Sequence, residues 1–318
     1  MVVPVHLGCC PDAPRCVLCP PPPQPPTPDL VEALIYRYGQ DHPGAPLELR
    51  FFGGAPPPNA LLDAAADVPT SIRVRPDLLS RERARQLRDR GVRAVELDAL
   101  SFDDATLRES GRRYRGALLH EMAKGLDALG FEVGGVLAPG LPRSSHHTAI
   151  ADAHAASLRW RFARIHPVLV LHRSALRDLH DHKQYVPLTL GEAITTCRAM
   201  MDVLEAAGVT VTRVGLQPGP DGFGRAVAGP RHSALRQLVE ARRTLDVLRE
   251  HLQGVPPGAD VTIACAPADE TRTRGPHNQH LRTLRAEARL GGLRVITDPR
   301  LPRGQVEVDT HIPLEEPS

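Results

Sequence analysis

Residues 47–97 read LELRFFGGAPPPNALLDAAADVPTSIRVRPDLLSRERARQLRDRGVRAVEL, and the repeating pattern in this stretch decides the fold. Three short apolar runs have the character of strands: LELRFF (47–52), SIRVR (71–75) and RAVEL (93–97). The stretches between them, about 58–66 and 80–90, have helical spacing of their apolar residues. Strands that alternate with helices in this way predict βαβ units and a parallel sheet.

The same alternation continues on both sides of this stretch. Toward the N-terminus, Val2–Leu7 reads as a first strand and about 29–40 as a helix. Toward the C-terminus, the expected elements are helix 103–129 with a break near Gly111, strand 131–137, helix 146–157, strand 163–171, helix 190–207 and strand 209–216. We therefore expect an α/β fold whose core is built from six βα units.

The last part of the chain has a different, smaller pattern. Its expected elements are helix 231–252, strand 261–266, helix 277–290 and strand 293–297. They predict a small α+β extension over residues 229–318, after a core domain at residues 1–228. The final residues, HIPLEEPS, read as a frayed tail.

Composition is that of an ordinary globular protein. The 318 residues are 42% apolar and 24% charged, and the net charge of +2 gives no global field for nucleic acid. No run is long enough for a membrane span, and the N-terminus lacks the features of a signal peptide. We therefore expect a cytoplasmic protein without a membrane partner. Cys197 and Cys265 lie in apolar contexts and are expected in the core.

Four of the six cysteines lie within eleven residues: Cys9, Cys10, Cys16 and Cys19. In a reducing compartment, such a cluster is more typical of a metal site than of disulfides. Four thiolates fit a structural zinc, although adjacent Cys9 and Cys10 are awkward ligands for one ion because successive side chains diverge. Three thiolates fit an iron–sulfur cluster with one open iron. The cysteines alone leave both metals open.

Unusual residues follow one predicted strand after another. Gly53-Gly54 follow the second strand, Arg75-Pro76-Asp77 the third, and Asp98–Ser101 the fourth. Active sites of parallel βα folds collect at the carboxyl ends of the strands. The pattern therefore predicts one functional edge, next to the cysteines.

Several of these stretches, in order, resemble the radical S-adenosylmethionine (SAM) superfamily, specifically the short bacterial branch related to the Elongator catalytic subunit, which has no acetyltransferase domain. The matching stretches are His6–Cys9, Cys16–Cys19, Phe51–Gly54, Arg75–Asp77, Glu96–Asp104, Gly140–Pro142, Arg164–Pro167 and Arg213–Pro218. The resemblance implies the radical SAM fold, a partial (β/α)6 TIM-like barrel, here with the small C-terminal extension.

The resemblance also implies two cofactors, a [4Fe–4S] cluster and S-adenosyl-L-methionine. Cys10, Cys16 and Cys19 are the expected cluster ligands, with Cys9 as the alternative to Cys10. The family usually has three residues between its first two cluster cysteines, whereas this chain has five after Cys10 or six after Cys9. Cys10 gives the shorter loop, which wraps a cluster more easily.

The expected SAM-binding residues lie at the strand ends. Gly53 and Gly54 have no β-carbon, so a ligand can approach their backbone, and in the family this segment binds the methionine amino group. Arg75 either clamps an anionic group or pairs with Asp77. Glu96 and Asp98 alternate along one strand and share a face, where they either bind ribose hydroxyls or neutralise Arg75. Ser101, in the matching stretch Glu96–Asp104, is included in the expected site.

The leading hypothesis is an enzyme that cleaves SAM reductively to a 5′-deoxyadenosyl radical acting on an unknown substrate. The resemblance implies a one-electron donor such as flavodoxin or ferredoxin, and tRNA or another RNA as a candidate substrate. The alternative is a degenerate, non-catalytic barrel that acts as a binding module. The histidines at 146–147, 166, 180 and 182 are expected as solvated surface residues, with the alternative that His166, after Arg164, lines the functional edge.

Overall fold

The computed structural model describes residues 1–8, 17–18, 25–65, 68–216 and 225–311. The chain divides into two compact units, Met1–Leu235 and Arg236–Ser318, and each is described here by itself. No helix within those ranges is long and apolar enough to cross a membrane.

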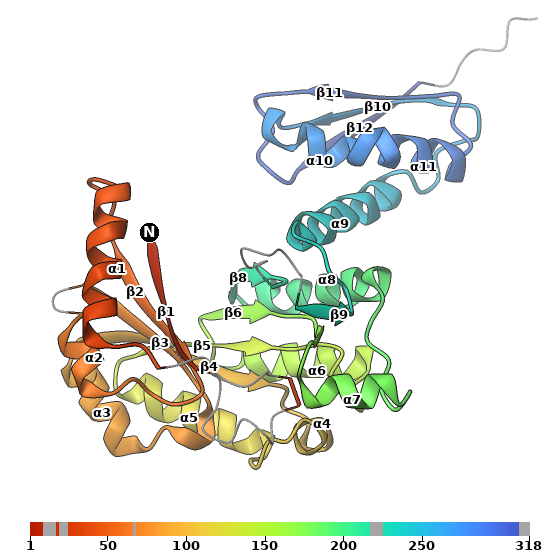
Figure 1. Cartoon of the computed structure of the whole chain (residues 1–318). Helices are drawn as coiled ribbons and strands as arrows, with labels where there is room; N and C mark the ends of the chain where they lie inside the picture. Colours follow the sequence, from red (N-terminus) through yellow and green to blue (C-terminus); the bar gives the residue numbers. More distant parts are fainter. Residues whose placement is uncertain (9–16, 19–24, 66–67, 217–224, 312–318) are drawn as a thin grey trace, which may run out of the picture. The chain divides into compact units, whose positions relative to one another are not determined.

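Unit 1 is built on a parallel sheet with the strand order β1-β2-β3-β4-β5-β6-β8. Its strands are β1 (Val2–Gly8), β2 (Glu48–Gly53), β3 (Thr70–Val74), β4 (Val92–Leu100), β5 (Glu132–Leu137), β6 (Phe162–Ile165) and β8 (Thr210–Val214). β1 and β8 are the two edges, so the sheet is an open half-barrel (Figure 1). The expected α/β class and partial barrel are confirmed.

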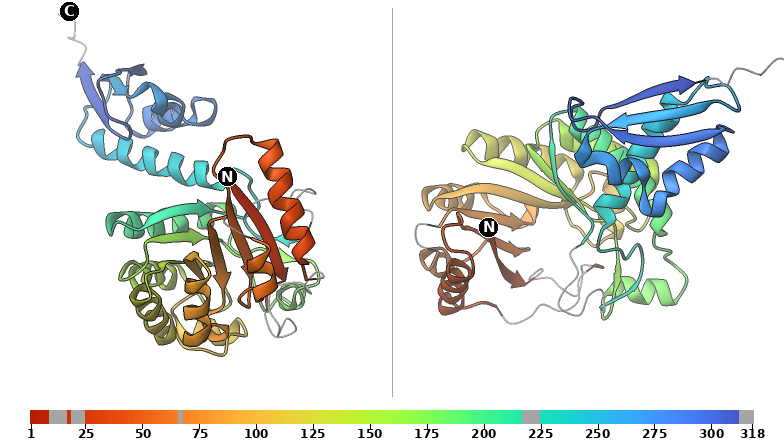
Figure 2. Two further views of the ribbon diagram at one scale, coloured as in Figure 1. Left: turned by 90° about the vertical axis from the view of Figure 1, so that its left-hand side faces the viewer. Right: turned by 90° about the horizontal axis from the view of Figure 1, so that it is seen from above.

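Helices cover the outer face of this sheet (Figure 2). They are α1 (Pro28–Asp41), α2 (Asn59–Asp63), α3 (Arg81–Asp89), α5 (Gly116–Ala128), α6 (His146–Ser157) and α8 (Leu190–Ala206). Two further helices lie on the side of the strands' carboxyl ends (Figure 1), α4 (Asp104–Glu109) and α7 (Ala175–Asp181), and α7 contacts the short strand Val170–Leu171. Fully buried side chains such as Leu49, Ile72 and Leu97 form the layer between strands and helices. Residues one position away, such as Arg50 and Glu96, belong to the opposite, concave face of the sheet.

One expected element of unit 1 differs in the structure, and the expected break near Gly111 is confirmed. The expected strand 163–171 is two strands, β6 and the short β7 (Val170–Leu171), because Pro167 has no N–H to donate to a sheet ladder. β7 pairs with β9 (Ala226–Ala228) outside the main sheet. The expected helix 103–129 is α4 and α5, separated by a turn at Gly111, whose φ is 75°.

Unit 2 has a three-stranded sheet with the order β11-β10-β12. Its elements are α9 (Leu235–His251), β10 (Asp260–Cys265), α10 (Glu270–Arg274), α11 (Gln279–Glu287), β11 (Gly292–Thr297) and β12 (Val306–His311). Leu248, Ile263 and Leu284 form its core. β12 was not expected, because its residues alternate between half-buried and exposed and carry little apolar signal. Cys197 and Cys265 are buried and free, as expected.

Candidate functional site

Gly8 and Val17–Leu18, the described neighbours of the cysteines in the chain, lie at the carboxyl edge of the sheet. β1 ends at Gly8, directly before Cys9, and the β1–β2 register pairs Gly8 with Gly53. Val17, directly after Cys16, accepts a hydrogen bond from the Leu176 N–H at 2.8 Å. The expected ligands Cys9, Cys10, Cys16 and Cys19 themselves lie outside the described residues. Their described neighbours in the chain, however, lie at the expected edge.

Val17 and Leu18, the two residues between Cys16 and Cys19, are anchored by apolar packing. They pack against a cluster from the carboxyl ends of β4, β5 and β7, which contains Leu100, Ala138, Leu141, Val168, Val170, Leu176 and Tyr185. Within the part of the chain that the structure describes, no three histidine, cysteine, aspartate or glutamate side chains form a metal-binding group.

Gly53, Gly54 and Arg75 meet at the same edge. The Arg75 N–H donates to the Gly54 carbonyl at 2.8 Å. The Arg75 side chain is 2% exposed and donates to both Asp77 oxygens, Nε to Oδ1 at 3.0 Å and Nη2 to Oδ2 at 2.6 Å. This bidentate pair is one of the two arrangements that the sequence left open for Arg75. Glu96 and Asp98, considered above as its neutralising partners, pair with other arginines.

A buried network of charges crosses the concave face above the middle of the sheet. Asp98 on β4 accepts hydrogen bonds from Arg73 Nε at 3.1 Å and from Arg112 Nη2 at 2.7 Å. Arg73 comes from β3 and Arg112 from the turn between α4 and α5. Burial alone would raise the pKa of Asp98, but the two guanidinium groups outweigh it and hold this pKa well below its usual range. Asp98 is therefore charged and its position is fixed.

Glu96 lies two residues earlier on β4 and is less well satisfied. It is 3% exposed, and its Oε2 lies 2.8 Å from Arg164 Nε on β6, while its Oε1 lies 3.8 Å from Arg73 Nε. Despite these ion pairs, both Glu96 oxygens and Arg164 Nε have no hydrogen-bond partner among the described residues, because the N–H groups are not aimed at the carboxylate. A buried carboxylate without hydrogen bonds is costly, so these atoms favour a ligand that donates to them.

His166, directly after β6, is a second unsatisfied group on this face. Its Nε2 is buried and has no partner in the described structure, so the expectation of a solvated histidine was wrong here. Burial, together with the charges of Arg73, Arg164 and Arg213, holds the pKa of His166 well below its usual value. The imidazole is therefore neutral and offers one hydrogen-bonding nitrogen to the interior of the half-barrel.

Two aromatic contacts continue this surface toward β1. The His6 and Phe52 rings are stacked with centroids 5.4 Å apart, and the Arg164 guanidinium carbon lies 5.6 Å from the Phe52 centroid. Arg164 is thereby held between Phe52 and Glu96.

Ser101 does not join this group. Its hydroxyl accepts a hydrogen bond from the Asp103 N–H at 3.1 Å and also bonds to Asp152 of α6, which belongs to the outer helix layer. Asp152 in turn accepts from the Phe102 N–H at 2.6 Å. The structure therefore brings Glu96 and Asp98 together with Arg73, Arg112, Arg164 and His166, and places Ser101 behind the sheet.

Two residues of this network were missed in the sequence. Arg73 was detectable, because it lies two positions before Arg75 on a strand and so belongs to the inward face. Arg112 carried no such signal, since it comes from an irregular turn.

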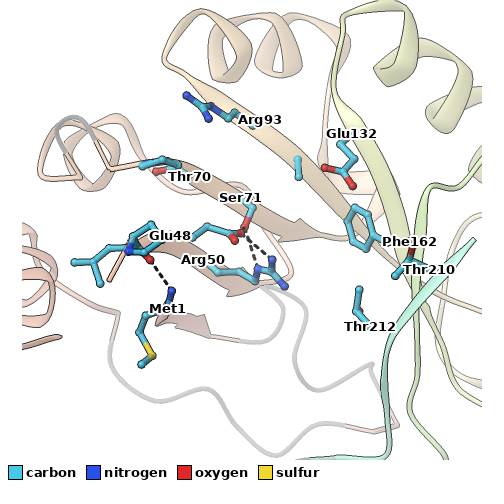
Figure 3. Close-up of a pocket in the computed structure, with 14 residues that line it drawn as sticks. Met1, Glu48, Arg50, Thr70, Ser71, Arg93, Glu132, Phe162, Thr210 and Thr212 are labelled. Atoms are coloured by element: carbon cyan, nitrogen blue, oxygen red, sulfur yellow. Dashed lines mark hydrogen bonds and ion pairs between the residues drawn. The ribbon is translucent and has the colours of Figure 1, made fainter. Parts of the chain in front are cut away.

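The opposite, amino-terminal end of the concave face contains a cavity of about 590 Å³ (Figure 3). Its central polar side chains satisfy one another. Arg50 donates to Ser71 at 2.9 Å and to Glu48 at 2.8 Å, and Ser71 donates to Glu48 at 2.6 Å. Polar side chains at the amino-terminal end satisfy one another, whereas buried polar atoms toward the carboxyl end have no partner among the described residues. The carboxyl end is therefore the candidate site.

Comparisons with known proteins agree with this arrangement. The Radical_SAM C-terminal domain family matches residues 160–246, which include β6, β8, Arg164 and His166. No curated protein matches the chain.

Solved structures share the fold. The archaeal Methanocaldococcus infernus Elp3 with an N-terminal deletion is 19% identical with a TM-score of 0.62, over 78% of this chain and 63% of that one. Coproporphyrinogen III oxidase (HemN) from Escherichia coli, described as a radical SAM enzyme, is 16% identical with a TM-score of 0.50, over 65% and 53% of the two chains. This chain thus spans less than two thirds of the Elp3 length. The family match over residues 160–246 and the shared fold confirm the predicted resemblance to the radical SAM superfamily, and the likeness to the Elp3 structure is one of fold.

Proposed function

We propose that this chain is a radical SAM enzyme that binds a [4Fe–4S] cluster through Cys10, Cys16 and Cys19, with Cys9 as the alternative to Cys10. One observation carries the proposal. The described neighbours of these cysteines, Gly8 and Val17–Leu18, lie at the carboxyl edge of a half-barrel. The same edge holds Gly53-Gly54 and leads to buried polar atoms that still need partners.

The donor set fits the two cofactors. Three thiolates suit an iron–sulfur cluster and leave one iron for the amino and carboxylate groups of SAM. A cluster bound there would supply one electron to the sulfonium of SAM, the chemistry that gives methionine and a 5′-deoxyadenosyl radical. The Gly54 carbonyl is already occupied by the Arg75 N–H, so other backbone groups of this edge would approach SAM.

In this proposal, the chain's own residues bind and orient SAM. Glu96 has two unsatisfied oxygens and therefore accepts two donors, which suits the hydroxyls of a ribose. Asp98 does not share this role, because Arg73 and Arg112 already occupy its oxygens. The neutral His166 contributes one further hydrogen bond from the neighbouring strand.

The same proposal includes partners. A one-electron donor such as flavodoxin or ferredoxin supplies the reducing equivalent, in the cytoplasm. The sequence resemblance to the Elongator-related branch makes tRNA or another RNA the candidate substrate, and the net charge of only +2 gives it no additional support.

The test compares Glu96→Gln with Glu48→Gln after anaerobic reconstitution. Glu48 is the matched control, since it lies on the same face but hydrogen-bonds Arg50 and Ser71 at the far end. With dithionite and SAM, the wild type should form 5′-deoxyadenosine. Glu96→Gln should weaken SAM binding roughly tenfold with unchanged iron content, as expected for losing charged hydrogen bonds of about 1.5 kcal/mol or more. Glu48→Gln should bind SAM normally.

Two results would contradict the proposal. One is a reconstituted chain that holds iron but neither binds nor cleaves SAM. The other is SAM binding without any iron, which would instead support the non-catalytic barrel.

A further inference from the structure

A compact basic surface lies beside the proposed site. Arg108, Arg112, Arg113 and Arg115 line a hollow of about 730 Å³ on α4 and the turn before α5, together with Asp104, Gly111 and Tyr114. Arg108, Arg113 and Arg115 are exposed, whereas Arg112 is buried against Asp98. The hollow therefore presents three arginine side chains to solvent.

Few carboxylates oppose these charges. Asp104 lies 4.0 Å from Arg115, and it also accepts the Gly116 N–H at 2.8 Å. Arg108 and Arg113 form no ion pair within 4.0 Å in the described parts of the chain, although Arg108 interacts electrostatically with Asp103 at the start of α4. Glu109, the other acid on α4, lies 3.9 Å from Arg143 instead. The surface thus has a local excess of positive charge on a chain that is almost neutral.

The hollow contacts the end of β4, and Val17 and Leu18 pack against the same strand end. Tyr114, behind the arginines, donates to the carbonyls of Asp98 and Ala99 at 3.2 and 3.0 Å. The next residue of β4, Leu100, belongs to the apolar cluster on which Val17 and Leu18 pack. The basic surface and the residues between Cys16 and Cys19 are therefore supported by the same three residues of β4. Figure 1 shows α4 on the side toward which the strand arrows point.

We propose that Arg108, Arg113 and Arg115 form the docking surface for an acidic one-electron donor protein of the flavodoxin or ferredoxin class. This inference rests on the proposed function. The donor would be oxidised by one electron, and the [4Fe–4S] cluster of the proposed function would be reduced by one. No atom has to cross the interface. Charge complementarity of this kind steers association and orients the partner.

The alternative polyanion, RNA, fits this surface less well. Single-stranded RNA is held by exposed aromatic rings on which bases stack, together with basic residues along a groove. The aromatic residue of the hollow, Tyr114, is 8% exposed and its hydroxyl is directed into the protein. The surface offers charge without a stacking platform.

The test uses the full, anaerobically reconstituted chain and the double variant Arg108→Glu/Arg113→Glu. Arg161→Glu is the matched control. Arg161 is also exposed, but it precedes β6 and so lies at the amino-terminal ends of the strands, away from the hollow. The probe is a fluorescently labelled flavodoxin, and its affinity is measured at low and high salt. We expect the double variant to bind roughly tenfold more weakly at low salt, with a difference of less than about threefold near 0.3 M salt, because screening removes exposed charge interactions.

A kinetic arm separates this inference from the proposed function. With dithionite, which needs no docking surface, the double variant should form 5′-deoxyadenosine as fast as the wild type. With reduced flavodoxin it should be roughly tenfold slower at low salt. If the wild type forms no product with dithionite, the proposed function fails, and the binding arm still decides the docking surface.

Two results would overturn the docking surface. One is a flavodoxin affinity that the double variant leaves unchanged. The other is a loss of binding to a bulk tRNA preparation with flavodoxin binding intact, which would assign the surface to RNA.

Discussion

Asp98→Asn tests whether the buried charge network stabilises the half-barrel. Asp98 is 6% exposed and accepts from Arg73 and Arg112, so the substitution leaves two guanidinium groups without their shared anion. Removing one partner of a buried ion pair typically costs about 3–5 kcal/mol. Asparagine keeps the shape and one acceptor oxygen, which places the expected loss near 3 kcal/mol.

The assay is urea denaturation followed by tryptophan fluorescence. Trp160 is the single tryptophan of the chain and is buried in unit 1, so its emission reports the unit that contains Asp98. Asp89→Asn is the control, since Asp89 is exposed at the end of α3 and should change stability by less than about 0.5 kcal/mol. The double variant Asp98→Asn/Arg112→Met should recover part of the loss, because it removes one uncompensated charge.

The pH dependence has a defined sign. The native pKa of Asp98 is depressed, so its contribution is complete well above the unfolded value of about 3.9 and is lost as pH falls toward the native value. A loss below about 1 kcal/mol at pH 7, or no recovery in the double variant, would refute the reasoning.

Two further stability predictions follow from single residues. Burial raises the pKa of Asp152 to about 6 in the folded state, above its value in the unfolded chain. The folded state therefore binds the proton more tightly than the unfolded state, and the free energy of unfolding falls as pH rises from about 4 to about 6. Asp152→Asn should therefore stabilise the chain by about 1–3 kcal/mol at pH 7.5 and flatten this pH dependence in urea titrations; unchanged pH dependence would count against it. A β-carbon at Gly135 would lie 2.4 Å from Trp160, so Gly135→Ala should destabilise by about 2 kcal/mol and alter the Trp160 emission. Gly125→Ala, in open space on helix α5, should instead stabilise by about 0.5–1 kcal/mol, and equal effects of the two would contradict the packing at Gly135.

The strand pattern in the sequence predicted the parallel sheet, and it placed the two carboxylates of the buried charge network, Glu96 and Asp98, on one face. Period-two alternation placed Glu96 and Asp98 on one face, and their contacts with Arg164 and Arg73 confirm that they share it. The same rule would have identified Arg73 from Arg75. α6 and α8, whose first turns are capped by Ser145 and Thr189, lie within one residue of their expected bounds.

Long-range partners are not encoded by local pattern. The turn that supplies Arg112 to Asp98 has no period, so nothing in its sequence indicates which strand it will meet. Ser101 follows the same strand as Asp98, yet Leu100 has a φ of 68°, and this left-handed residue turns the chain toward α6. β12 (Val306–His311), an edge strand with weak apolar content, was not predicted from the sequence.

The iron and sulfide content after anaerobic reconstitution tests the central claim most directly. The account predicts about four irons and four sulfides per chain and a broad absorption near 400 nm, as for thiolate-held clusters. Cys16→Ser and Cys19→Ser should each lose the cluster, while Cys197→Ser, at a buried free cysteine, should keep it. One zinc per chain, or a wild type with less than about one iron, would contradict the account.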